Sequence, residues 1–227
     1  MALLLLTGAV ASGATLQGDA TALSWFTSLD DGGASHVVAR ILVMGGQFWL
    51  AGSVLALLAA FQGWVQRSLR PVLVAGVSMA GLEAVVWALK ALTGRTAPAS
   101  GVNAVLAGGS SFPSGHAAAA TFAMLLGVAL LRGSGSGRPG PRRHGRPRRS
   151  WLVGLTGAVT VGVCTLLLGY HWPSDAVGGW LLGALAAGVA ARGLTSRAGD
   201  HPWLVTSDGC DRQPSRPVAT PATRGPR

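Results

Sequence analysis

Long stretches without charged residues alternate along this chain with short segments that hold most of its charge. Residues 41–60 and 151–170 each run for 20 positions without a charged side chain. A helix rises about 1.5 Å per residue, so 20 residues cross a hydrocarbon core of roughly 30 Å. The pattern therefore predicts two membrane-spanning helices.

Three further apolar stretches contain isolated ionisable residues. They cover residues 71–92, 113–131 and 173–191, with Lys90 near the end of the first and Asp175 near the start of the third. Each is long enough to cross a membrane, and an ionisable group there needs a partner or a function. We expect an all-α, polytopic membrane helix bundle with five well-defined spans.

A sixth apolar stretch, residues 1–16, is shorter and would bring the total to about six spans. It fits a transmembrane helix, a cleaved signal peptide or the remainder of a helix that starts upstream. The segment lacks basic residues at its start, which a signal peptide would have, and this favours the first interpretation. Residues 17–36 are predicted to form an exterior loop that can include a short amphipathic helix.

The overall composition agrees with a membrane protein, at 49% hydrophobic and 11% charged residues. The net charge of +10 lies mainly in residues 67–70, 132–149 and 192–227, which hold fifteen of the eighteen basic residues. This asymmetry predicts a multi-pass plasma or inner membrane protein whose basic loop 132–150 and C-terminus are cytoplasmic. Arginines next to spans favour contact with anionic lipid headgroups, so we expect no nucleic-acid partner.

Residues 1–195 are predicted to form one membrane-embedded domain. The remainder, 196–227, is polar and rich in proline, which is typical of a disordered tail. Cys164 lies in a predicted span and Cys210 in the tail, so the two are not expected to form a disulfide.

The predicted topology brings four ionisable residues to the extracytoplasmic face. Taken alone, each has an ordinary explanation, because lysine can snorkel, histidine can lie at the interface and aspartate can cap a helix. Polar groups within a span cost about 2.5–3.5 kcal/mol each, so their joint placement favours a functional site. The four residues are Lys90, His116, His171 and Asp175.

Residues 113–116 read Pro-Ser-Gly-His at the start of a predicted helix. Proline suits the first turn, where the free N–H groups of Ser114, Gly115 and His116 would point outward with the positive end of the helix dipole. Such a helix start binds anions. The Ser114 hydroxyl and the Lys90 ammonium would add a hydrogen bond and a charge.

Pro173 is predicted to begin the last span, which places Asp175 in its first turn and within reach of His171. A carboxylate beside an imidazole fixes its tautomer and raises its basicity. With His116 as a second imidazole, the set suits phosphoryl transfer, in which one ring attacks phosphorus and the other protonates the leaving oxygen. The exterior carboxylates form no cluster suited to Mg²⁺, so no metal or other cofactor is expected. They are Asp19, Asp30, Asp31 and Asp175.

The chain resembles the type 2 phosphatidic acid phosphatases in three features. These are Lys90, the sequence Pro-Ser-Gly-His at 113–116 and the sequence Gly-Tyr-His-Trp-Pro-Ser-Asp at 169–175. These lipid phosphate phosphatases share their site with vanadium-dependent haloperoxidases. The resemblance covers residues 71–191. It implies that His171 is the nucleophile that forms a phosphohistidine, that Asp175 orients it, and that His116 is the general acid. The residues implied to bind phosphate are Lys90, Ser114 and Gly115.

Two positions depart from the family pattern. Where the family has arginines, this chain has Ala97 and Thr165. Their joint loss is expected to cost on the order of 10³ to 10⁵ in rate. We predict that Arg95 substitutes as a phosphate ligand, with Arg40 as the alternative.

Four functions therefore stay open, with the oligomeric state undetermined. The first is hydrolysis of a lipid phosphomonoester or diphosphate, such as phosphatidic acid, phosphatidylglycerol phosphate or a polyprenyl phosphate or diphosphate. The second is a catalytically impaired relative that binds a phosphorylated lipid. An intramembrane serine protease using Ser114 and His171, or a haem or metal site on His116 and His171, explains fewer of the residues.

Overall fold

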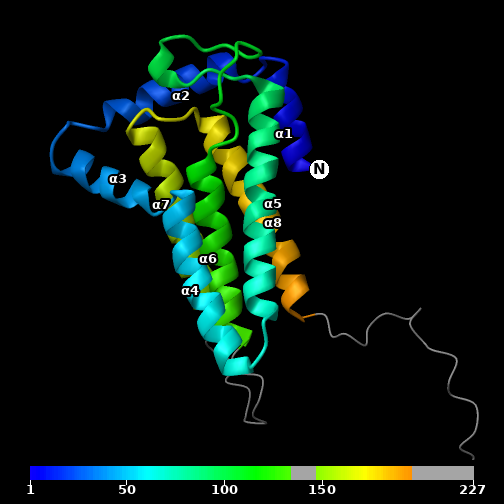
Figure 1. Ribbon diagram of the computed structural model, residues 1–227. Helices are drawn as coiled ribbons and strands as arrows, with labels where there is room; N and C mark the ends of the chain where they lie inside the picture. The colour runs from blue at the N-terminus through cyan, green and yellow to red at the C-terminus, as the bar shows by residue number, and fades with distance from the viewer. Residues whose placement is uncertain (134–146, 196–227) are drawn as a thin grey trace, which may run out of the picture. The chain divides into compact units, whose positions relative to one another are not determined.

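The computed structural model describes residues 1–133 and 147–195, and within these ranges every regular element is helical, as predicted (Figure 1). The elements are α1 (Ala2–Ala11), α2 (Leu16–Ser28), α3 (Ala34–Met44), α4 (Phe48–Gln66), α5 (Arg70–Thr93), the short 3₁₀ helix η1 (Pro98–Ser100), α6 (Gly115–Gly133), α7 (Pro147–Leu167) and α8 (Pro173–Thr195).

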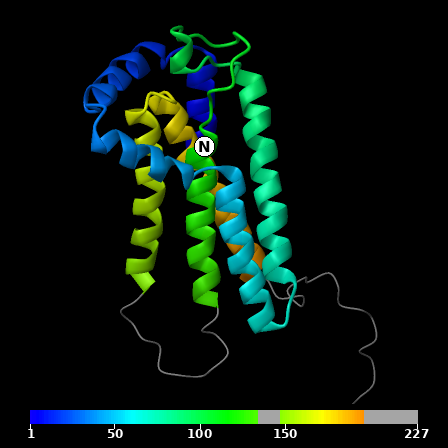
Figure 2. The ribbon, with the colours of Figure 1, turned by 60° about the vertical axis from the view of Figure 1, so that its left-hand side comes forward.

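The five helices α4 to α8 are each long and apolar enough to cross a membrane, which confirms the prediction of five spans. Successive spans run in opposite directions, as Figures 1 and 2 show. The end of α5, the start of α6, the end of α7 and the start of α8 therefore meet at one end of the bundle.

The span predicted at 41–60 is displaced in the structure. Residues 45–47 end α3 and turn the chain into α4, which begins only at Phe48. At this turn the backbone passes directly over the start of α6. The approach is so close that a β-carbon on Gly46 would lie 2.6 Å from the carbonyl oxygen of His116. Only glycine permits this approach, and the approach sets the break between the two helices.

The N-terminal segments differ most from the prediction. Helix α1 has ten residues, about 15 Å, and is too short to cross the membrane; it packs instead against α5 and α8. The predicted exterior loop 17–36 consists mainly of α2 and the start of α3. Helix α2 packs against α7 and α8 and lies across the end of the bundle where α5 ends (Figures 1 and 2).

Helix α6 forms the centre of the bundle and contacts α4, α5, α7 and α8. Residues 117–120 are four alanines that are fully or almost fully buried. The contact with α8 is especially close, because a β-carbon on Gly179 would lie 2.5 Å from the Ser114 carbonyl oxygen, and one on Gly183 would lie 2.4 Å from that of Ala118. Small residues thus allow the two helix backbones to meet.

Contacts group residues 1–195 into one compact unit. The predicted cytoplasmic tail, 196–227, and most of the basic loop 132–150 lie outside the described residues. The predictions of a disordered tail and of an unpaired Cys210 therefore stay predictions.

The contact between α6 and α8 can be tested with Gly179→Ala. The new methyl group would meet backbone atoms that cannot rotate away, so we expect a loss of about 1–3 kcal/mol in unfolding free energy and a fall of roughly 5 °C in Tm. Gly188→Ala on the same helix is the matched control, because a β-carbon there has no heavy atom within 4 Å. Thermal unfolding in detergent, followed by tryptophan fluorescence, measures both. Equal Tm values for the two variants would contradict the close packing.

Candidate active site

The converging helix ends bring together the four ionisable residues singled out from the sequence. Lys90 lies in the last turn of α5 and His116 in the first turn of α6. His171 lies in the connection between α7 and α8, and Asp175 is in the first turn of α8, which begins at Pro173 as predicted.

The two imidazoles lie close to each other. The ring centroids of His116 and His171 are 6.4 Å apart, and the ring planes are inclined by 59°. A reacting nitrogen approaches phosphorus to about 3–3.5 Å, and a general acid lies about 2.6–3.2 Å from the oxygen that it protonates. At this centroid separation, both rings are close enough to contact the same phosphoryl group.

Lys90 supplies a positive charge beside the two rings. It lies close enough to His116 and Asp175 for their charges to interact. Its ammonium group forms no hydrogen bond or ion pair with any residue in the described part of the chain. It is therefore available to an anionic ligand.

Behind His171 lies a buried carboxylate that is linked to it partly through a hydroxyl group. Asp175 Oδ2 is 3.5 Å from His171 Nδ1, and it accepts hydrogen bonds from Ser111 Oγ at 2.5 Å and from the Trp172 backbone N–H at 3.0 Å. Ser111 Oγ itself lies 3.4 Å from His171 Nδ1. The carboxylate and the hydroxyl together hold Nδ1, which leaves Nε2 as the reactive nitrogen.

Sequence reasoning missed Ser111, although it directly precedes the Phe-Pro-Ser-Gly-His motif. It is held in place by the loop that follows α5, where Ser111 N donates to the Arg95 carbonyl oxygen at 2.9 Å. This loop can fold back over the helix end because Gly94 adopts a left-handed conformation, with φ of 50°, and accepts hydrogen bonds from Ala107 N and Gly109 N.

Arg95 occupies a different place from the one predicted. Its side chain is fully buried, and its Nη1 donates to Ser174 Oγ at 2.5 Å and to Asp175 Oδ1 at 3.1 Å. Its Nη2 donates to Asp19 Oδ2 at 2.7 Å and to Asn103 Oδ1 at 3.2 Å. Both terminal nitrogens thus bind acceptors of the protein, whereas Nε has no hydrogen-bond partner among the described residues. The phosphate-binding role of Arg95 stays a prediction.

The start of α6 also differs in detail from the predicted anion site. The helix begins at Gly115 rather than at Pro113. Ser114 is fully buried and caps the helix, since its Oγ accepts from Ala117 N at 3.3 Å. Its own N–H donates to the Asp175 carbonyl oxygen at 2.9 Å and is not free. The N–H groups of Gly115 and His116 remain in the first turn, where a helix offers no acceptor of its own.

The positions where the family pattern has arginine contribute no cation here. Thr165 is fully buried in α7, and its Oγ1 donates to the Gly162 carbonyl oxygen at 2.6 Å. Ala97 lies half-buried directly before η1. Arg40 is exposed on α3, so its role as a substitute stays a prediction.

The geometry also bears on two of the other functions. The hydroxyl within hydrogen-bond distance of His171 Nδ1 belongs to Ser111, whereas Ser114 Oγ caps α6. In the described part of the chain, no hydrogen bond joins Ser114 to His171, as a protease pair would require. Within residues 1–133 and 147–195, no group of three or more His, Cys, Asp or Glu side chains is arranged to hold a metal ion.

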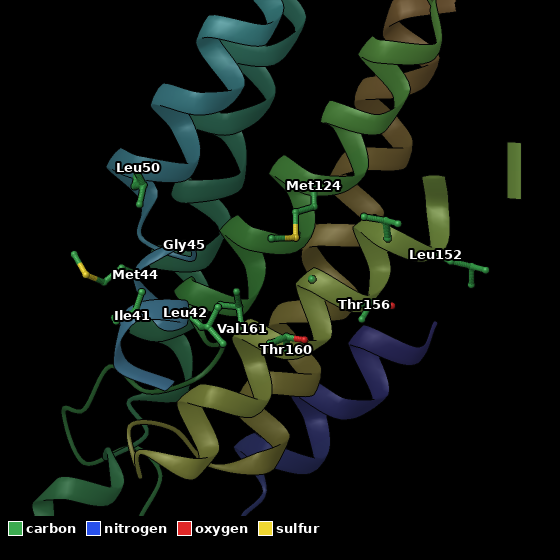
Figure 3. Close-up of a pocket in the computed structure, with 12 residues that line it drawn as sticks. Ile41, Leu42, Met44, Gly45, Leu50, Met124, Leu152, Thr156, Thr160 and Val161 are labelled. Carbon is green, nitrogen blue, oxygen red and sulfur yellow. The ribbon is translucent and has the colours of Figure 1, made fainter. Parts of the chain in front are cut away.

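An apolar groove of about 630 Å³ lies between α3, α4, α6 and α7. Figure 3 shows Leu50 and Met124 on its walls, together with Val161. A second apolar cavity shares five lining residues with the first and extends the groove along α4 and α6. The shared residues are Gly45, Leu50, Met124, Val153 and Gly157.

One wall of the groove lies next to the turn at Gly46. Val161, which lines the groove, would contact a β-carbon on Gly46, the residue that lies over the His116 carbonyl. The wall of the groove therefore adjoins the start of α6.

Residues 71–197, more than half of the chain, match the model of the PAP2 superfamily. This chain belongs to the PAP2 superfamily. The resemblance stated from the sequence is confirmed, and the five apolar helices make this PAP2 member a multi-pass membrane protein.

Two known proteins are similar to this PAP2 member. An undecaprenyl-diphosphatase from Sulfolobus acidocaldarius is 35% identical over 74 residues, which cover 33% of this chain and 29% of that protein. The chain thus aligns with less than a third of the curated relative's length. The crystal structure of a transmembrane PAP2 type phosphatidylglycerolphosphate phosphatase from Bacillus subtilis has the same fold, with a TM-score of 0.67 and 18% identity. That match covers 86% of this chain and 94% of the other.

The contacts of Arg95 predict a structural effect that needs no substrate. In Arg95→Ala, the buried carboxylates of Asp19 and Asp175 lose their cation, so we expect a loss of about 3–5 kcal/mol and a fall in Tm of roughly 10 °C. Arg40→Ala, at an exposed arginine near the same end of the bundle, is the control and should leave Tm within about 2 °C of wild type. An unchanged Tm for Arg95→Ala, measured without ligand, would instead support the phosphate-binding role.

Proposed function

We propose that this PAP2 member hydrolyses a phosphate ester or diphosphate of a membrane lipid through a phosphohistidine on His171. The observation that carries the proposal is the pair of imidazoles 6.4 Å apart, of which only His171 is backed by the Asp175 carboxylate. A protein that only binds phosphate needs no such asymmetry between its two histidines.

In the proposed first step, Nε2 of His171 attacks phosphorus, and the bond from phosphorus to the leaving oxygen breaks. His116 in its protonated form gives its proton to that oxygen. In the second step, neutral His116 takes a proton from water, and the water oxygen attacks the phosphorus of the phosphohistidine. The bond between phosphorus and Nε2 of His171 breaks, which releases inorganic phosphate and regenerates the free imidazole. Lys90 and the N–H groups of Gly115 and His116 stabilise the charge on the phosphoryl oxygens.

A lipid substrate is supported by the apolar groove beside the start of α6. Its surface is almost entirely apolar, as an acyl or isoprenoid chain requires. Among the expected substrates, we favour a diphosphate. Its leaving group is a phosphate, which departs more readily than a lipid alkoxide and needs less help from the missing arginines. The named relative is a diphosphatase as well.

The extracytoplasmic position of the site belongs to this proposal. Arg67 directly follows α4, and Arg70 is the first residue of α5. Arg132 lies in the last turn of α6, and Arg192 lies in the last turn of α8. All are at the bundle end opposite to His171. The positive-inside rule places that end in the cytoplasm and the site on the outer side.

A second function, binding of a phosphorylated lipid without turnover, is favoured by one observation. Ala97 and Thr165 replace both arginines of the family pattern, and Arg95 is engaged elsewhere. Such a protein would bind lipid phosphates and release no phosphate.

The proposed function is tested by phosphate release from lipid phosphates and diphosphates by purified protein in detergent. We expect activity that is unchanged by a chelator, is inhibited by vanadate and falls at least about 10³-fold in His171→Ala. His36→Ala is the matched control, because His36 pairs with Asp30 outside the site. Binding without release by the wild type would establish the second function, and turnover that survives in His171→Ala would remove the proposed nucleophile.

Restoring an arginine gives a complementary prediction. Ala97 is half-buried in a loop, so Ala97→Arg is expected to fit and to raise kcat/KM by about ten-fold or more through added charge at the phosphoryl group. Thr165→Arg places the same side chain in a fully buried position of α7, where we expect a lower yield of folded protein instead. An Ala97→Arg enzyme no faster than wild type would show that the existing groups already supply this stabilisation.

A further inference from the structure

Asp19 is a buried carboxylate on α2, ahead of the segment that matches the family. Its side chain is only 5% exposed. Its Oδ1 accepts the backbone N–H of Ser174 at 2.8 Å, and its Oδ2 accepts the Ser174 hydroxyl at 2.7 Å. Asp19 is therefore bound to the residue directly before Asp175.

The Ser174 contact makes Asp19 a cap for α8 that comes from another helix. The N–H of Ser174 is one of the first-turn donors that a helix cannot satisfy by itself. A carboxylate at this end also interacts favourably with the helix dipole. The contact fixes the start of α8, and with it the backbone that carries Asp175.

The second link between Asp19 and the site is Arg95. This guanidinium binds Asp19 through Nη2 and Asp175 through Nη1, so one cation is shared by two buried carboxylates. Asn103 joins the same group: its Oδ1 accepts from Arg95, and its Nδ2 donates to the Leu16 carbonyl oxygen at 2.7 Å. The first turn of α2 is thus attached to the loop that also holds Ser111.

We propose that Asp19 is a positioning residue of the active site, which holds Asp175, and through it His171, by way of Ser174 and Arg95. The inference rests on the proposed function. Because Asp19 binds Nη2 of Arg95, the guanidinium contacts Asp175 through Nη1 alone. The other carboxylate oxygen of Asp175, Oδ2, then stays directed at Ser111 and His171. Helix α2 is by this account part of the active site, although it does not touch the substrate.

The experiment compares the same chemical change at two carboxylates of the N-terminal segment. Asp19→Asn removes the buried charge at almost constant volume. Asp31→Asn is the matched control, because Asp31 is exposed and, among the described residues, its side chain accepts hydrogen bonds from its neighbours Gly33 and Ser35 only. The kcat and KM for a lipid diphosphate are measured on the monodisperse fraction of each protein.

For Asp19→Asn we expect kcat to fall about ten- to a hundred-fold, as for other outer partners of reacting groups, and KM to stay within about three-fold. Asp31→Asn should match the wild type. If Asp19→Asn gives no monodisperse protein, Asn103→Ala is judged by the same criterion, since it loosens Arg95 and α2 without removing a charge.

Two results would overturn the inference while leaving the proposed function intact. The first is a kcat for Asp19→Asn equal to that of Asp31→Asn. The second is a rise in KM at unchanged kcat, which would make Asp19 a contributor to binding. If the wild type and Asp31→Asn both fail to release phosphate, the proposed function itself fails, and the inference fails with it.

Discussion

The Asp175 carboxylate is the point on which the rest of this structure depends. It is fully buried near the end of an apolar bundle, where an unpaired charge would be severely unfavourable. Its partners come from separate parts of the chain: Arg95 and Ser111 from the loop after α5, and His171 and Trp172 from the connection after α7. Satisfying this one anion therefore brings both connections to the same place, and the histidine becomes oriented as a consequence.

The direct contact between α6 and α8 gives this arrangement its rigidity. His116 lies on one helix and Asp175 on the other, and the Ser114 N–H joins them by donating to the Asp175 carbonyl oxygen. Gly179 allows that approach, because any larger residue would push the Ser114 carbonyl away. The separation of the two imidazoles is thus set by backbone contact between small residues, which tolerates much less adjustment than contact between long side chains.

Those features that depend on local composition could be predicted from the sequence. Apolar stretches predicted the five spans, and the positions of the arginines predicted which helix ends lie on the same side of the membrane. From these two features, Lys90, His116, His171 and Asp175 were expected at one end of the bundle, where the structure places them. The role of Arg95 could not be obtained in this way, because its partners Asp19 and Asp175 lie 76 and 80 positions away. The break at Gly46 likewise depends on a distant carbonyl, that of His116, and hydropathy carries no information about such a contact.

The absence of the two family arginines changes how the site can stabilise an anion. Arg95 is shared between the two buried carboxylates of Asp19 and Asp175, so its charge is already used within the protein. In the proposed reaction, the positive potential at the phosphoryl group would then come from Lys90, from protonated His116 and from the N–H groups at the start of α6. An ammonium and a helix start bind phosphate without the fixed two-pronged geometry of a guanidinium. Under the proposed function, the placement of the substrate then depends more on its apolar chain, for which we propose the apolar groove beside Gly45 and Val161.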